Sequence, residues 1–165
     1  MALNIAQRVD RGVKYLDEKI PNWLEIINLE TLKLDDCNFC VMGQLVGWAQ
    51  ENHREEIEAS DDIEPYSING YFAATVSCNN IAAARVEHGE YGWNLKRRIT
   101  KLLGIGDRPM TLKEARRRGF HTNNNTYIAE DNAEWNALTD EWAARITSLR
   151  VLRDVKFNPQ PHELV

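Results

Sequence analysis

The sequence has only three cysteines and no run of apolar residues long enough to cross a membrane. Three cysteines cannot close a disulfide framework, which is typical of a reducing compartment, and a membrane-spanning helix needs about 18 consecutive apolar residues. The segment Met1-Ala2-Leu3-Asn4 also lacks the basic start and the apolar stretch of a signal peptide. We therefore expect a cytoplasmic protein with no membrane partner.

Complete catalytic motifs are also missing. The sequence has no phosphate-cradling glycine loop, no nucleophile elbow and no His-Glu-x-x-His helix. Acidic pairs such as Asp35-Asp36 and Asp61-Asp62 are adjacent in sequence, so their side chains diverge on a helix and suit two-carboxylate acid–base chemistry poorly. These absences favour a non-enzymatic role, although they do not decide whether the protein is an enzyme.

Apolar residues at helical spacing predict a long helix at each end of the chain. The first begins at Leu3 and ends near Ile20, because Pro21 disfavours helical geometry in the residue before it and can open a short second helix. The last begins at Asp131 or Asn132. Their buried stripes are Ala6, Val9, Val13, Leu16 and Ile20 in the first helix, and Trp135, Leu138, Trp142, Ile146 and Leu149 in the last. The charged side chains that fall mostly off the first stripe and can remain exposed are Arg8, Asp10, Arg11, Lys14 and Glu18.

Shorter helices are predicted between these two, over residues 39–50, 80–86, 93–103 and 112–118. The helix over 39–50 begins at a cap provided by Asp35, Asp36 or Asn38 and buries Val41, Leu45 and Trp48, while Gly43 and Gly47 leave a strip for close packing. Thr111-x-x-Glu114 has the spacing of a capping box. Gly104 and Gly119 lie where helices should end.

Length and composition complete the predicted architecture. A chain of 165 residues with 43% apolar and 27% charged residues is typical of one globular domain. We predict an all-α (mostly α), irregular single-domain helical bundle over residues 1–157, followed by an extended C-terminal tail over 158–165. Residues 60–71 are expected to form a surface loop. Residues 71–77 are the one stretch that fits a short β element, and they fit a buried helical segment equally well.

Charge is strongly segregated along the chain. Residues 1–91 hold 7 Lys and Arg against 16 Asp and Glu, whereas residues 92–120 hold 9 against 2. The acidic first part argues against general nucleic-acid binding. The basic block can still form a local site for an anionic partner, or it can pair with acidic helices within the fold. Its candidate binding residues are Lys96, Arg97, Arg98, Arg116, Arg117 and Arg118.

Cys37-Asn38-Phe39-Cys40 carries the strongest local chemical signal. A Cys-x-x-Cys pair at a helix start can lower a thiol pKa for redox or nucleophilic chemistry, or can supply half of a zinc site. The zinc site would need two further ligands from Cys78, His53, His88 and His121. The third interpretation is structural, with Cys40 in the core and Cys37 partly exposed. We expect no cofactor, with zinc at Cys37 and Cys40 as the alternative.

Two further segments suggest binding surfaces. The segment from Thr111 to Gly119 is similar to the first helix and turn of a helix-turn-helix, but the position expected to anchor the second helix is Asn125, which favours a loop. Among the five tryptophans, Trp93 is flanked by Gly92 and Asn94 and is the candidate partner anchor, whereas the other four fall on apolar stripes and are expected in the core.

Several blocks form a distinctive set. Cys37-x-x-Cys40-Val41-Met42-Gly43-Gln44-Leu45-Val46-Gly47 is followed late in the chain by Gly119-Phe120 and Leu138-Thr139-x-x-Trp142-x-x-x-Ile146. Arg8-Val9-x-x-Gly12 and Leu16-Asp17-Glu18-x-x-Pro21-x-Trp23 precede them. Together these blocks resemble the small uncharacterised C-x-x-C-V-x-G-Q-L proteins of actinobacteria and their phages. The resemblance covers both ends of the chain, and residues 51–110 depart from it. It implies an origin rather than a reaction. A buried Gln44 would need backbone partners for its amide.

The leading functional hypothesis is therefore a non-enzymatic accessory protein, encoded by a phage and acting in the cytoplasm of its bacterial host. It would bind a host or phage macromolecule, with a protein as the first expected partner. The alternatives are a nucleic-acid-binding protein that uses the basic residues between 96 and 118, and a zinc- or thiol-dependent protein centred on Cys37 and Cys40.

Overall fold

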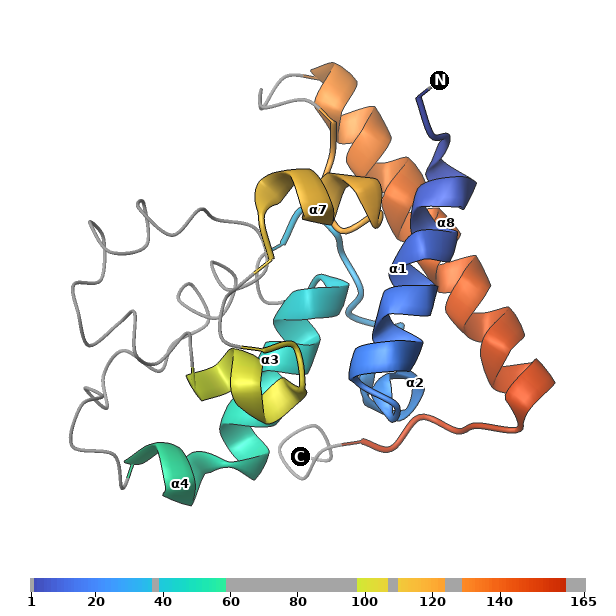
Figure 1. Cartoon of the computed structure of the whole chain (residues 1–165). Helices are drawn as coiled ribbons and strands as arrows, with labels where there is room; N and C mark the ends of the chain where they lie inside the picture. Colours follow the sequence, from blue (N-terminus) through green and yellow to red (C-terminus); the bar gives the residue numbers. More distant parts are fainter. Residues whose placement is uncertain (1, 37–38, 59–97, 107–109, 124–128, 160–165) are drawn as a thin grey trace.

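The computed structural model describes residues 2–36, 39–58, 98–106, 110–123 and 129–159, and within these ranges the regular structure is entirely helical. The labelled helices are α1 (Ile5–Lys19), α2 (Trp23–Ile26), α3 (Val41–Asn52), α4 (Arg54–Glu58), α7 (Leu112–Arg117) and α8 (Ala129–Arg153) (Figure 1). Residues 98–103 are also helical. The predicted mostly α fold is therefore confirmed. The expectations for residues 60–71, 71–77 and 80–86 lie outside the described ranges.

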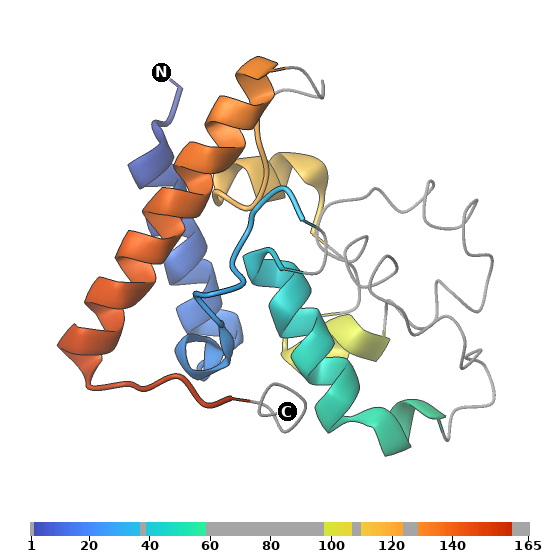
Figure 2. The same ribbon diagram turned by 180° about the vertical axis from the view of Figure 1, so that it is seen from behind.

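The two long helices, α1 and α8, lie side by side and run in the same direction (Figures 1 and 2). Among the described residues, three ion pairs join them in the same order along both helices: Arg8 with Glu134, Asp10 with Arg145, and Asp17 with Arg153. α7 crosses near the start of this pair, α2 packs against α8 toward its other end, and α3 packs against α2. The order of the ion pairs follows from the parallel arrangement.

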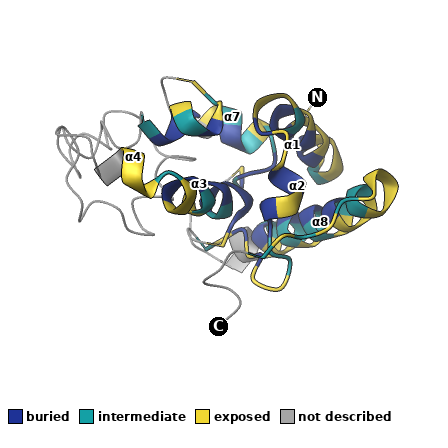
Figure 3. Cartoon of the chain, turned by 90° about the horizontal axis from the view of Figure 1, so that it is seen from below, coloured by how far each residue is buried: buried dark blue, intermediate teal, exposed yellow. Residues whose placement is uncertain are grey.

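The core lies where these helices face one another, and the ribbon segments coloured as buried in Figure 3 lie on these inner sides. Every predicted stripe residue of α1 except Ala6 is buried, and so is every predicted stripe residue of α8 except Leu149, which is partly buried. The ring of Trp142 stacks on Phe120 at 5.3 Å between centroids and meets Trp23 edge-on at 6.0 Å. Aromatic pairs in these geometries add stabilisation beyond the apolar area that they bury.

Local signals predicted three helix ends correctly. Thr111 caps α7, and both reciprocal hydrogen bonds of the capping box form with Glu114. Gly104 follows the helix over 98–103 with φ +88°, and Gly119 follows α7 with φ +71°. These left-handed conformations favour glycine because it has no Cβ atom.

Several predicted boundaries were wrong. α2 begins at Trp23 instead of Pro21, because a turn from Ile20 to Trp23 comes first. The cap of α3 is Cys40, because the carbonyl of Asp36 accepts from the amides of residues 39 and 40 and closes a turn before the helix. α8 begins at residue 129, two residues before the expected range. Gly47 lies exposed with open space beside it, so it does not form a packing strip with Gly43.

After α8 the chain is extended and returns along α2. The amide of Asn158 donates to the carbonyl of Glu25 at 2.8 Å. The guanidinium of Arg150 donates to the carbonyls of Leu24 and Ile27, which lie at the end of α2. The described part of the chain contains no helix that is both long enough and apolar enough to span a bilayer.

Candidate anion-binding pocket

The end of α7 packs closely against α1 because glycine occupies the contact point. A Cβ atom built on Gly12 would lie 2.2 Å from the carbonyl oxygen of Arg118 and 2.6 Å from Cζ2 of Trp142. The indole N–H of Trp142 donates to the carbonyl of Gly119 at 2.7 Å. α1, α7 and α8 therefore meet at one place, and the space beside it lies between α1 and α7.

Arg8 forms the base of this space and is only 3% exposed, contrary to the expectation that it can remain exposed. Its guanidinium donates to the Arg116 carbonyl at 2.8 Å, to Glu134 at 2.8 Å and to the His121 carbonyl. The same Glu134 oxygen accepts from the backbone amide of Asn123 at 2.9 Å. A buried cation is tolerated only when it is paired and hydrogen-bonded, and Arg8 meets both conditions.

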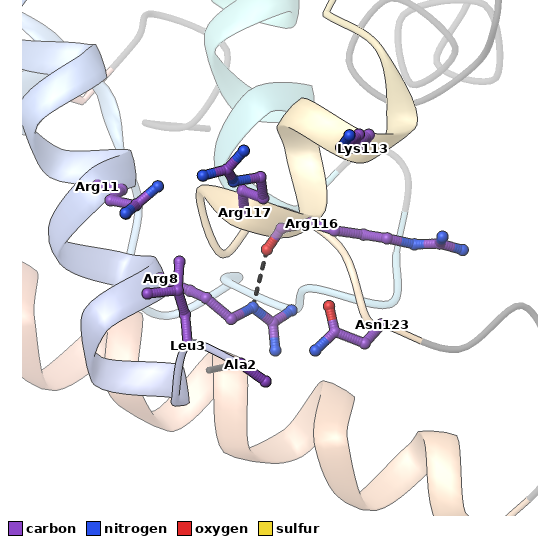
Figure 4. Close-up of a pocket in the computed structure, with 8 residues that line it drawn as sticks. All are labelled: Ala2, Leu3, Arg8, Arg11, Lys113, Arg116, Arg117 and Asn123. Carbon is purple, nitrogen blue, oxygen red and sulfur yellow. Dashed lines mark hydrogen bonds between the residues drawn. The ribbon is translucent and has the colours of Figure 1, made fainter.

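Beside Arg8 a pocket of about 410 Å³ opens between α1 and α7 (Figure 4). We name it the α1–α7 basic pocket; it is lined by Ala2, Leu3, Arg8, Arg11, Lys113, Arg116, Arg117 and Asn123. Arg11 extends from α1 toward α7, and Arg117 approaches it from the end of α7 (Figure 4). These described lining residues include five cations and no carboxylate, so the pocket favours anions.

Three of the cations are available to a ligand. Arg11, Lys113 and Arg117 are exposed. Within the part of the chain that the structure describes, they form no ion pair or hydrogen bond with another residue. Arg116 differs because its Nε donates to the carbonyl of Thr122 at 2.9 Å, which fixes the loop after α7. The available positive charge therefore comes from two separate helices.

His121 borders the base of the pocket and is mostly buried. Burial lowers the pKa of its imidazole, whereas the hydrogen bond from Nδ1 to the Thr122 carbonyl, at 3.0 Å, raises it; burial has the larger effect. The ring also meets Trp135 edge-on at 4.8 Å. A lowered pKa keeps His121 neutral at neutral pH, so it adds no charge beside Arg8.

The described residues of the predicted basic block lie in different places on the molecule. Lys96 and Arg97 lie outside the described residues. Arg98 belongs to the helix over 98–103, which lies beside α3 and well below α7 in Figures 1 and 2. Arg118 points elsewhere, with its guanidinium 4.1 Å from the centroid of the Tyr15 ring. Of the four candidates within the described residues, Arg116 and Arg117 line the pocket.

Sequence reasoning missed Arg8, Arg11 and Lys113. Arg8 and Arg11 are three residues apart and lie on neighbouring faces of α1, which is a visible signal for a basic ridge. Nothing local in the sequence indicated that this ridge would face α7, because their contact joins residues more than 100 positions apart.

The Cys-x-x-Cys segment has a structural role at Cys40. This residue is buried, and its Sγ accepts from the amide of Gly43 at 3.2 Å as the cap of α3. His53 lies at the other end of this 12-residue helix, about 18 Å away at 1.5 Å per residue, so it cannot share a metal ion with Cys40. No group of three metal-ligating side chains occurs among the described residues. Cys37, Cys78 and His88 lie outside them.

The other predicted binding elements give a mixed result. Residues 120–123, directly after Gly119, are not helical and Phe120 is buried, so no second helix starts directly after the turn as a helix-turn-helix requires. Trp93 and Asn125 lie outside the described residues. Trp23, Trp135 and Trp142 are in the core, as expected, and Trp48 is partly buried.

The side-chain amide of Gln44 has the backbone hydrogen-bond partners that its sequence context led us to expect. Its Oε1 accepts from the Asn28 amide at 2.7 Å, and its Nε2 donates to the carbonyls of Asn28 and Phe39 at 3.2 and 3.0 Å. The side chain therefore ties the turn before α3 to the segment after α2.

In the comparisons with known proteins, no family model, no curated protein and no solved structure matches the chain.

Proposed function

We propose that the protein is a non-enzymatic accessory protein that binds a nucleic acid through the α1–α7 basic pocket. The single observation that carries this proposal is the convergence of Arg11, Lys113 and Arg117 from two helices on a pocket whose described lining has no carboxylate. Arginine is suited to phosphate because its planar guanidinium can donate two parallel hydrogen bonds to phosphate oxygens.

The distribution of charge supports a local and oriented contact. The chain carries a net charge of −5, which opposes indiscriminate binding to a polyanion. The acidic helix α4 lies at the far side of the molecule from α7 (Figure 1). A nucleic acid would therefore be attracted to one face and repelled by another. This asymmetry favours a defined docking orientation over coating of the whole surface.

A phosphate-bearing partner also fits better than a neutral protein surface. The pocket places cations where an apolar interface would place aromatic anchors. An acidic protein remains the competing partner, since carboxylates also pair with arginine. The origin in a phage that the sequence resemblance implies stays a prediction, and the proposed binding does not depend on it.

The test is a salt titration of binding to a labelled 20-nucleotide single strand, measured by fluorescence anisotropy. We expect affinity to fall steeply with salt, because each neutralised phosphate contributes about −0.7 to the slope of log K against log salt for single strands. The triple variant Arg11→Gln/Lys113→Gln/Arg117→Gln should bind at least tenfold more weakly at low salt, and its slope should be shallower by about 2.

The matched control is Lys33→Gln/Arg54→Gln/Lys156→Gln, which removes three exposed positive charges outside the pocket. It changes the net charge equally, so a specific site predicts that it retains most of the affinity and slope. Equal losses in the two triple variants would mean that only net charge matters and would refute the proposed site. Binding of an acidic polypeptide in preference to the oligonucleotide would refute the proposed partner.

A further inference from the structure

We infer that the α1–α7 basic pocket receives a terminal phosphomonoester at the end of a single nucleic-acid strand, in preference to the phosphodiesters along the strand. This inference rests on the proposed function and specifies which part of the nucleic acid enters the pocket. It depends on the size of the pocket, on the number of cations around it and on the chemistry of its remaining walls.

The pocket is an open recess between elements. Its volume of about 410 Å³ falls in the range of about 300–1,000 Å³ that is typical of sites for small ligands. The walls come from residues 2–3, from α1, from α7 and from the loop after α7. A recess of this size suits one terminal nucleotide.

The charge favours the more highly charged form of phosphate. A phosphomonoester carries about −1.5 to −2 at neutral pH, whereas a diester within the strand carries −1. Arg11 and Arg117 face one another across the pocket, and Lys113 adds a third charge from α7 (Figure 4). Glu134 forms an ion pair with Arg8 at the base of the pocket. The unmatched positive charge therefore exceeds what one diester would neutralise.

The other walls suit the nucleoside that is attached to such a phosphate. Ala2 and Leu3 supply an apolar side, against which a sugar or base can lose water. The side-chain amide of Asn123 lies beside the guanidinium of Arg8 and is directed into the pocket (Figure 4). An amide offers both a donor and an acceptor to a base edge or a sugar hydroxyl. Because the terminal nucleotide has to be unstacked to enter, a single-stranded end is preferred over a blunt duplex.

The experiment compares oligonucleotides of one sequence that differ only at their ends, in the full-length protein at fixed salt. The set is a 12-nucleotide single strand with a 5′-phosphate, with a 3′-phosphate, or with hydroxyls at both ends. We expect at least one phosphorylated strand to bind ten or more times as tightly as the hydroxyl strand. Arg11→Gln and Arg117→Gln should each reduce this ratio to below about threefold, while Lys156→Gln should preserve it.

The outcomes separate this inference from the function on which it rests. If all three strands bind equally with a salt-dependent affinity, the terminal-phosphate inference is wrong and the proposed function stands. If none of the strands binds, the proposed function itself is wrong. Adenosine monophosphate and a phosphoserine peptide serve as competitors. If either competes as strongly per mole as the phosphorylated strand, the phosphate comes from a free nucleotide or a phosphoprotein, and the assignment to a strand end is overturned.

Discussion

Two glycines inside helices allow the same substitution to be tested in opposite packing environments. Gly12 lies within α1, where an added Cβ atom would approach the Arg118 carbonyl oxygen to 2.2 Å and the Trp142 ring to 2.6 Å. Gly47 lies within α3, where nothing lies within 4 Å of the same added atom. Gly12→Ala and Gly47→Ala should therefore change stability in opposite directions.

The magnitudes follow from two competing effects. Alanine is favoured over glycine in a helix interior by about 1 kcal/mol, because glycine loses more backbone freedom on folding. At Gly47 this is the whole effect, so the variant should gain about 0.5–1 kcal/mol. At Gly12 the backbone of Arg118 and the ring of Trp142 must both move, and overpacking of this kind costs about 1–3 kcal/mol or more. Taking the upper part of that range, Gly12→Ala should lose about 2 kcal/mol net.

The assay is thermal and urea unfolding of both variants, followed by circular dichroism. For a chain of this length, 1 kcal/mol shifts Tm by about 2–4 °C. Gly12→Ala should therefore lower Tm by about 4–8 °C, and Gly47→Ala should raise it by about 1–4 °C. A Gly12→Ala protein as stable as the wild type would refute the close approach of α7 and α8 to α1. A destabilised Gly47→Ala protein would show that α3 is packed on its open side.

Three further predictions concern buried polar groups. Glu134→Ala should cost about 3 kcal/mol in urea unfolding, because it leaves the buried charge of Arg8 without its carboxylate; a loss below 1 kcal/mol would contradict the pairing. Burial lowers the pKa of His121 below 6.5, so protonation is less favourable in the folded state, and wild-type stability should fall as pH drops below about 6.5. His121→Gln should reduce that fall between pH 7 and 5, and an unchanged pH profile would exclude this cause. Asp17→Ala should cost about 1–3 kcal/mol, because the buried indole N–H of Trp23 loses its acceptor; nuclear magnetic resonance of that N–H should report the change.

The ion pair between Asp17 and Arg153 should also make the protein less stable in acid, as His121 does, but for a different reason. The hydrogen bond from Arg153 lowers the pKa of Asp17 below its usual 3.8. The stabilisation by this ion pair is therefore complete above the usual pKa of an aspartate, and it is lost as the pH falls through the lowered pKa of Asp17. Because both side chains are about one-third exposed, the pair contributes at most about 1 kcal/mol. The effects of His121 and Asp17 can thus be separated by their pH ranges.

The helical stripes were predictable because periodicity reflects a physical requirement that acts along the chain. Val9, Val13 and Leu16 recur at helical spacing and are buried in α1. Ala6 belongs to the same stripe but is exposed, since the stripe extends beyond the surface that covers it. Local spacing predicts which face of a helix is apolar. How much of that face is buried depends on the segments elsewhere in the chain that pack against it.

The burial of Arg8 could not be predicted for a related reason. Hydropathy places an arginine outside the core, and its partners become available only after α7 and α8 pack against α1. Those partners lie 108 and 126 residues away in sequence. The predicted start of α3 was wrong because of residues close by in the sequence. The turn closed by Asp36 competes with an aspartate cap and moves the helix start to Cys40.

The candidate pocket depends on the same folding event as the core, because α1 provides both. Val9 and Val13 face the core, Gly12 admits the end of α7, and Arg11 remains on the side that faces the pocket. Buried Arg8 links the three helices through a carbonyl of α7 and a carboxylate of α8, so the exposed cations are held in place without being neutralised. Replacing Arg8 should therefore weaken both stability and binding, whereas replacing Arg11 should weaken binding alone.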